Sequence, residues 1–142
     1  MWRWVAIGCC LAMLAGCGNP DQKLREAAAQ SARAAASEVA MTQLVVEQLQ
    51  AHKLWPQPAD QMVGDAEKSL EKAVSSFTAQ QPATDSSRRL YDEVGTALDD
   101  AQKAVTATRI ALGQDDLAAA GRQLAVLRKS GERLERIGEL AK

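Results

Sequence analysis

The side chains of this chain that most readily form covalent bonds are those of its three cysteines, at positions 9, 10 and 17. A cysteine sulfur can be alkylated, can form a disulfide or can ligate a metal ion. All three lie within the first 17 residues, so the rest of the 142-residue chain has no thiol. A disulfide or a thiolate metal site is therefore excluded from residue 18 onward.

Other chemically active side chains are few and form no recognisable catalytic arrangement. His52 is the only histidine, whereas a structural zinc site needs four Cys or His ligands and a helical di-iron site needs paired Glu and His. No serine lies in a Gly-x-Ser-x-Gly turn. The adjacent carboxylates Asp99-Asp100 and Asp115-Asp116 would point about 100° apart on a helix, so they do not converge. We expect no enzyme and no metal ion, and we expect His52 to face solvent near a helix end.

The segment that leads to the third cysteine has the order of a secretory signal peptide. Arg3 and the amino terminus supply positive charge, an apolar run follows from Trp4 to Ala15, and small residues precede Cys17. This run is shorter than the roughly 20 apolar residues that a bilayer-spanning helix needs. We expect residues 1–16 to be a cleaved leader.

The last four residues of this segment, Leu14-Ala15-Gly16-Cys17, resemble the lipobox of bacterial lipoproteins at every position. The resemblance implies that the Cys17 sulfur receives a diacylglycerol, that cleavage falls between Gly16 and Cys17, and that the new amino terminus is acylated. These covalent lipids are the only non-protein groups that we expect. The resemblance is specific only over residues 1–18; the rest is similar to secretion-pilot and conjugation-exclusion lipoproteins by type alone.

A lipid on Cys17 would hold residues 17–142 on a membrane. Each buried methylene contributes about 0.8 kcal/mol, so two or three acyl chains bind essentially permanently. Gly18 follows the cysteine, in place of the aspartate that resembles an inner-membrane retention signal. We therefore expect the outer membrane, facing the periplasm, if the cell has two membranes. Otherwise we expect the outer face of the cytoplasmic membrane.

The rest of the chain has the pattern of four amphipathic helices, at about 21–54, 58–80, 85–112 and 116–140. Prolines and Gly113 divide these segments, and apolar residues recur within them at steps of three and four. The expected inward positions are Leu24, Ala28, Ser31, Ala35, Val39, Thr42, Val46, Leu49, Val63, Ala66, Leu70, Val74, Phe77, Leu90, Val94, Leu98, Ala101, Val105, Thr108, Leu112, Leu117, Ala120, Leu124, Leu127, Gly131, Leu134 and Ile137. Short links between such helices predict an all-α protein, an antiparallel up-and-down four-helix bundle.

Residues at the segment ends suit the starts and stops of helices. Asp21 and Asp115 are the expected N-caps of the first and last helices, and Pro58 fits the first turn of the second. Gly113 is the expected terminator of the third helix.

The first segment would span roughly 50 Å and the second nearer 35 Å, so the first should overhang. Its Ala27–Ala36 stretch is the expected projecting part and has no large apolar side chain. The stretch then serves either as a stalk or as a surface on which alanine lets two helices approach closely.

Two features of the helical part are candidates for contact with a partner protein. Trp55, the only tryptophan after the leader, lies on a link stiffened by proline. It either closes the end of the bundle or is exposed as a binding anchor. Gly121, Gly131 and Gly138 would mark a seam in the last segment where another helix packs tightly.

Charged residues of both signs alternate along the last segment. They are Arg122, Arg128, Lys129, Glu132, Arg133, Glu135, Arg136 and Glu139. Such a face is either simply solvated or docks an acidic partner or a lipid head group.

These features together favour a non-enzymatic, lipid-anchored module that binds another envelope protein. The alternative is an envelope carrier that holds a small hydrophobic or metal ligand in a cavity lined by residues such as Leu70, Phe77, Leu98 and Leu124. A formal net charge of −1 argues against nucleic acid as a partner.

Overall fold

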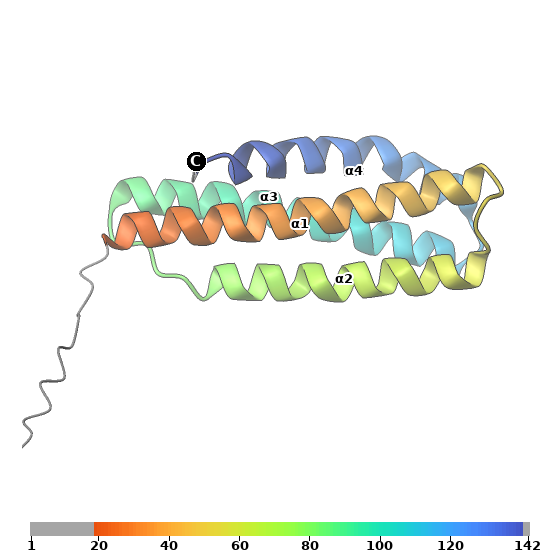
Figure 1. Cartoon of the computed structure of the whole chain (residues 1–142), viewed down its shortest axis with the longest axis horizontal. Coiled ribbons are helices and arrows are strands. Elements are labelled where there is room, and N and C mark those ends of the chain that lie inside the picture. Colours follow the sequence, from red (N-terminus) through yellow and green to blue (C-terminus); the bar gives the residue numbers. More distant parts are fainter. Residues whose placement is uncertain (1–18, 141–142) are drawn as a thin grey trace, which may run out of the picture.

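The computed structural model describes residues 19–140, and over this range every regular element is a helix. The helices are α1 (Pro20–Gln50), α2 (Pro56–Thr78), α3 (Asp85–Gly113) and α4 (Leu117–Gly138). They run alternately up and down along one axis (Figure 1), which confirms the predicted antiparallel four-helix bundle. The expected leader, residues 1–16, and the expected lipidation and cleavage positions Gly16 and Cys17 lie outside the described residues.

In cross-section the four helices lie at the corners of a square, and α1 and α3, on one diagonal, are close enough to contact one another. α1 contacts all three other helices, whereas the described residues of α2 and α4, at opposite corners, do not contact one another. The start of α1, the α2–α3 link and the end of α4 lie at one end of the bundle, which we call the Pro20 end (Figure 1). The α1–α2 and α3–α4 links lie at the other end, which we call the Trp55 end.

Side-chain caps begin three of the helices. Asn19, two residues before the expected Asp21, caps α1 by accepting a hydrogen bond from the Asp21 amide at 3.1 Å. Thr84 and Ser87 form a reciprocal capping box at the start of α3. Asp116, one residue after the expected Asp115, caps α4 by accepting from the Ala119 amide at 2.8 Å.

Left-handed residues end α1 and α3 at the Trp55 end. His52 has φ 56° and Asp115 has φ 55°, and the amide after each bonds back to the carbonyl five residues earlier. This is the Schellman arrangement, which stops a helix firmly. α1 therefore ends at Gln50, four residues before the expected Leu54. Gly113 was expected as the terminator of α3, but it stays helical because Asp115 takes the left-handed position.

The core is built from the positions that the periodicity predicts. Every expected inward position of α1 is buried, from Leu24 to Leu49. Phe77 is fully buried and stacks on Tyr91, with ring centroids 5.2 Å apart. Some expected inward positions near the helix ends are only partly buried against this core, among them Val74, Leu90, Leu112, Leu117 and Leu124.

The expected overhang of α1 does not occur. In the Ala27–Ala36 stretch, Ala28, Ala32 and Ala35 have no exposed surface and belong to the main core. α3 is nearly as long as α1, and the Thr84 hydroxyl donates to the Asp21 carboxylate, so both helices reach the same level. The stalk interpretation is therefore wrong, and the close-approach interpretation is confirmed.

Candidate functional site

The backbone of the α1–α2 link holds Trp55 between two constraints. On one side the left-handed His52 ends α1. On the other side Pro56 is the first residue of α2, and a residue before proline is restricted to extended conformations. Trp55 adopts that conformation, with φ −83° and ψ 148°. The link therefore fixes the backbone from which the indole projects.

The Trp55 side chain lies on the surface of this end and does not close the core. Trp55 is 80% exposed, whereas its neighbour Leu54 packs against the core cluster. The end-closing role that one interpretation gave to Trp55 thus falls to Leu54. Trp is enriched at protein interfaces, so this exposed indole is a candidate contact for a partner.

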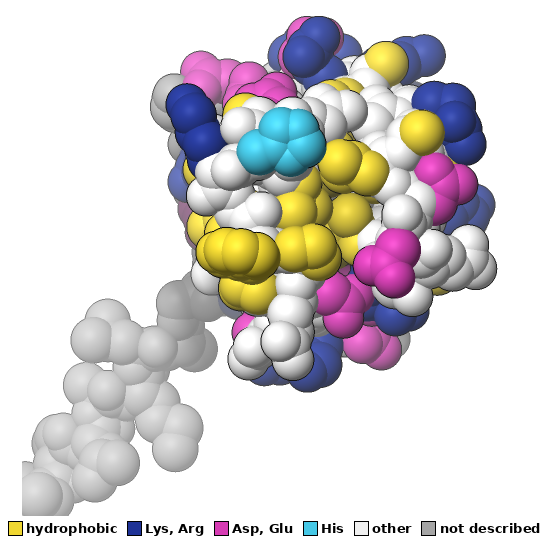
Figure 2. Space-filling model, turned by 90° about the vertical axis from the view of Figure 1, so that its right-hand side faces the viewer, with side chains coloured by type: hydrophobic (Ala, Val, Ile, Leu, Met, Phe, Trp, Pro, Cys, Tyr) yellow, Lys and Arg dark blue, Asp and Glu magenta, His cyan; other side chains and the backbone are white. Residues whose placement is uncertain are grey.

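Other apolar side chains surround Trp55. A hollow of about 420 Å³ at the Trp55 end is lined by Leu49, His52, Lys53, Leu54, Trp55, Pro56 and Leu117. Figure 2 shows hydrophobic side chains gathered over the middle of this end, with charged side chains around the margin. We call the seven residues that line this hollow the Trp55 patch. An apolar centre with a polar rim is the general composition of a protein-binding surface.

The glycines of α4 meet α1 of the same chain. A Cβ at Gly121 would overlap the Gln50 side chain, and one at Gly138 would lie 2.9 Å from that of Arg33. Gly131 is buried against Val39. Gly121, Gly131 and Gly138 do mark a seam for a closely packed helix, but α1 fills it. The expectation that they contact a partner protein is corrected accordingly.

The acidic pairs do not act together. Asp99 pairs with Lys103 at 2.6 Å, while the adjacent Asp100 pairs with Arg133 of α4 at 3.0 Å. The hydrogen bond from Lys103 to Asp99, with the charge of that carboxylate, raises the pKa of Lys103. Asp115 and Asp116 are used in ending α3 and starting α4.

One polar cluster that the sequence did not indicate joins α2 to α3. Glu67 accepts hydrogen bonds from the Thr106 hydroxyl and from the Arg109 guanidinium. A charge-assisted bond of this kind is stronger than a neutral one and fixes the register of the two helices. Glu67 precedes Thr106 and Arg109 by 39 and 42 residues and lies on a different helix, so only the fold brings the three side chains together.

Within residues 19–140, His, Cys, Asp and Glu side chains nowhere gather in threes as metal ligands. None of the helices in this range combines the length and the apolar character needed to cross a bilayer. Comparison with known protein families, curated sequences and solved structures gave no match.

Proposed function

We propose that this chain is a non-enzymatic, lipid-anchored envelope module that binds another envelope protein through the Trp55 patch. The lipobox at Leu14–Cys17 supports the anchor, since its sulfur-bearing residue has small and apolar neighbours in the order that lipoproteins share. In this proposal the membrane holds the Pro20 end, and the partner meets the opposite end.

The observation that carries the proposal is the exposure of Trp55 on a rigid link. Because the backbone of Trp55 is already fixed, a partner need order only its side chain, which lowers the entropy cost of binding. Trp is also among the residues that most often dominate the energy of protein–protein interfaces.

Chain length relates the anchor to this patch. Only Gly18 and Asn19 separate Cys17 from Pro20, so the Cα of the lipidated residue would lie within about 11 Å of the Cα of Pro20. α1 then spans 31 residues, or about 46 Å. The Trp55 patch would therefore lie at the end of the bundle away from the anchor, where a partner anchored or assembled in the envelope could reach it.

The alternative function, a ligand carrier, has less support from the packing. Leu70, Phe77 and Leu98 were the expected lining of a ligand cavity, and each has no exposed surface within the core. The fourth residue, Leu124, packs at the edge of a smaller cluster. The best-formed hollows between residues 19 and 140 are open and are lined by other residues.

Photocrosslinking in cells tests the proposal. A benzophenone amino acid replaces Gln57, an exposed residue beside the Trp55 patch, and in a matched control it replaces Glu71, exposed near the middle of α2. We expect a discrete adduct from position 57 that is lost with Trp55→Ala and with Cys17→Ser. Identical adducts from both positions, or none from position 57, would contradict the proposed surface.

A further inference from the structure

The outward face of α1 loses its charges after Arg33. Between residues 34 and 51 the only charged side chains are Glu38, which is partly buried, and Glu47. The side chains that recur at steps of three and four on the side away from the core are uncharged. They are Ala34, Ser37, Met41, Leu44, Gln48 and Ala51, which we call the α1 strip. All of them are exposed except Gln48, which is partly buried.

The middle of the α1 strip is apolar, and its apolar surface continues onto α2. Leu44 is 50% exposed and Met41 is 41% exposed. Ala34 and Ser69 line one hollow between the antiparallel helices α1 and α2, so residues seven further along each helix toward the Trp55 end lie at one level. Those residues are Met41 and Met62, and Met62 is also exposed. Methionine side chains are flexible and adapt to the surface that covers them.

Over stretches of equal length, the other helices carry more exposed charge than α1. Five exposed side chains are charged on α2 (residues 56–73), three on α3 (96–113) and six on α4 (121–138), against Glu47 alone on α1 (34–51). A lack of charged residues is what distinguishes the centre of a protein interface from the rest of a protein surface.

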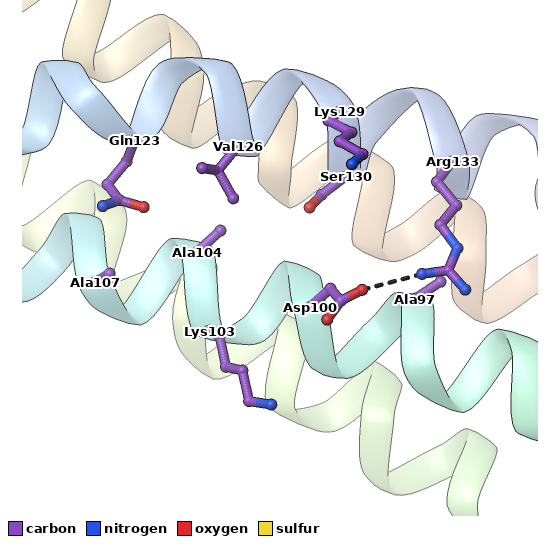
Figure 3. A pocket seen from close by; sticks show the side chains of 10 residues that line it. All are labelled: Ala97, Asp100, Lys103, Ala104, Ala107, Gln123, Val126, Lys129, Ser130 and Arg133. Atoms are coloured by element: carbon purple, nitrogen blue, oxygen red, sulfur yellow. Dashed lines mark hydrogen bonds and ion pairs between the residues drawn. The ribbon is translucent and has the colours of Figure 1, made fainter.

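The seam between α3 and α4 shows the difference. Its hollow of about 490 Å³ has four charged lining residues, and the ion pair from Asp100 of α3 to Arg133 of α4 runs across it at 3.0 Å (Figure 3). Val126, the exposed apolar side chain there, has the exposed cations Arg122 and Lys129 one turn away on either side. An uncharged strip therefore does not form at this seam.

The α1 strip adjoins the Trp55 patch. The strip ends at Ala51, and Leu49 and His52 on either side of that residue belong to the patch. From Ala34 to Ala51 the strip is about 26 Å long. With the width of one helix, about 10 Å, it offers roughly 260 Å², about a third of the ~800 Å² that each partner buries in a standard interface. The strip alone is too small for a stable interface, including one between two copies of this chain, and needs the Trp55 patch to complete it.

We propose that the partner bound at the Trp55 patch packs an uncharged amphipathic helix along the α1 strip. A helix fits because the ridge of Met41 and Leu44 alternates with small side chains, which leave grooves for the ridges of a second helix. The contacting face is uncharged because a charged side chain pressed against the strip would lose its water and meet no opposite charge. A lipid surface is disfavoured, since helices that lie on membranes carry Lys and Arg beside their apolar face, whereas Glu38 and Glu47 flank this strip.

This inference rests on the proposed function, so its test reads both surfaces in the same cells. A benzophenone amino acid replaces Ser37 of the strip in the full chain, or Ala125, an exposed residue of α4, as the matched control. We expect mass spectrometry to identify the same partner in adducts from positions 37 and 57, and no adduct from position 125. An adduct from position 57 without one from position 37 overturns the inference and leaves the proposed function standing. No adduct from position 57 contradicts the proposed function itself. A lipid or a second copy of this chain in the adduct from position 37 overturns the inference.

Charge substitutions test the chemistry of the partner helix. Leu44→Lys and Leu44→Glu should each lower the yield of the adduct from position 57 by about tenfold or more, because a charge of either sign would be buried without a partner. Ala125→Lys and Ala125→Glu should leave the yield unchanged. Circular dichroism during urea unfolding checks the fold, and the same pair of substitutions at the exposed Ser37 repeats the test. Opposite effects of the two charges would reveal a charged partner face, and no effect of either would place the partner elsewhere. Both results overturn the inference.

Discussion

Replacing Trp55 or Phe77 with alanine separates a binding side chain from a core side chain. Both residues are aromatic, but Trp55 is 80% exposed and Phe77 has no exposed surface. If Trp55 exists to contact a partner, its loss should leave the bundle nearly as stable as before. Loss of Phe77 should instead weaken the fold itself.

The expected magnitudes follow from these exposures. A fully buried Trp covers roughly 250 Å², so the buried fifth of Trp55 amounts to about 50 Å². At about 25 cal/mol per Å², Trp55→Ala costs at most ~1 kcal/mol of unfolding free energy. Phe77→Ala removes a buried ring and its stack on Tyr91, and should cost about 3–5 kcal/mol.

Urea unfolding followed by circular dichroism measures both costs on the same protein. We expect the midpoint to fall far more for Phe77→Ala than for Trp55→Ala, with similar slopes. As long as the variant is folded, Trp55→Ala should weaken the crosslink from position 57 more than Phe77→Ala does. If Trp55→Ala destabilises the bundle as much as Phe77→Ala, the indole packs into the core, and its assignment as a partner contact is refuted.

Substitutions at three further positions test the account of the fold. Burial raises the pKa of Glu38 above its ordinary value of 4.5, so its charge lowers stability as the pH rises through the raised pKa. Glu38→Gln should therefore be more stable than the parent near neutral pH, with the difference vanishing below about pH 4 in urea titrations. Gly131→Ala adds a Cβ at an ordinary 3.5 Å from Val39 and gains helix propensity, so thermal unfolding should show up to about 1 kcal/mol of stabilisation. Gly131→Leu should lose about 1–3 kcal/mol by overpacking, and equal effects of both substitutions would contradict the close α1–α4 seam. His52→Gly should stabilise the protein by up to about 1 kcal/mol because glycine enters the left-handed region without strain; a loss in the same unfolding assay would give His52 a role other than ending α1.

The sequence predicted the helices and their inward faces because both depend on local periodicity. Leu24 and Val39 repeat at the spacing of one helix face, and that spacing alone placed them in the core. Helix ends were less predictable. His52 and Asp115 adopt left-handed conformations that are usual for glycine, and their residue types gave no sufficient signal.

Features that depend on how helices pack were not predictable from one segment at a time. The glycines of α4 indicated a tight seam, but only the fold shows that α1 occupies it. The exposure of Trp55 was one of two open alternatives, because a tryptophan followed by Pro56 and Pro58 suits both a core cap and a surface anchor.

The most direct test of the proposed function is the mass of the amino-terminal tryptic peptide of the protein isolated from cell membranes. Trypsin cleaves after Arg3 and Lys23, so a processed lipoprotein yields Cys17–Lys23. We predict this peptide with the added mass of a diacylglycerol on sulfur and an acyl chain on the new amino terminus. Recovery of Trp4–Lys23 with all its cysteines as free thiols would contradict the membrane anchor, and with it the proposed function.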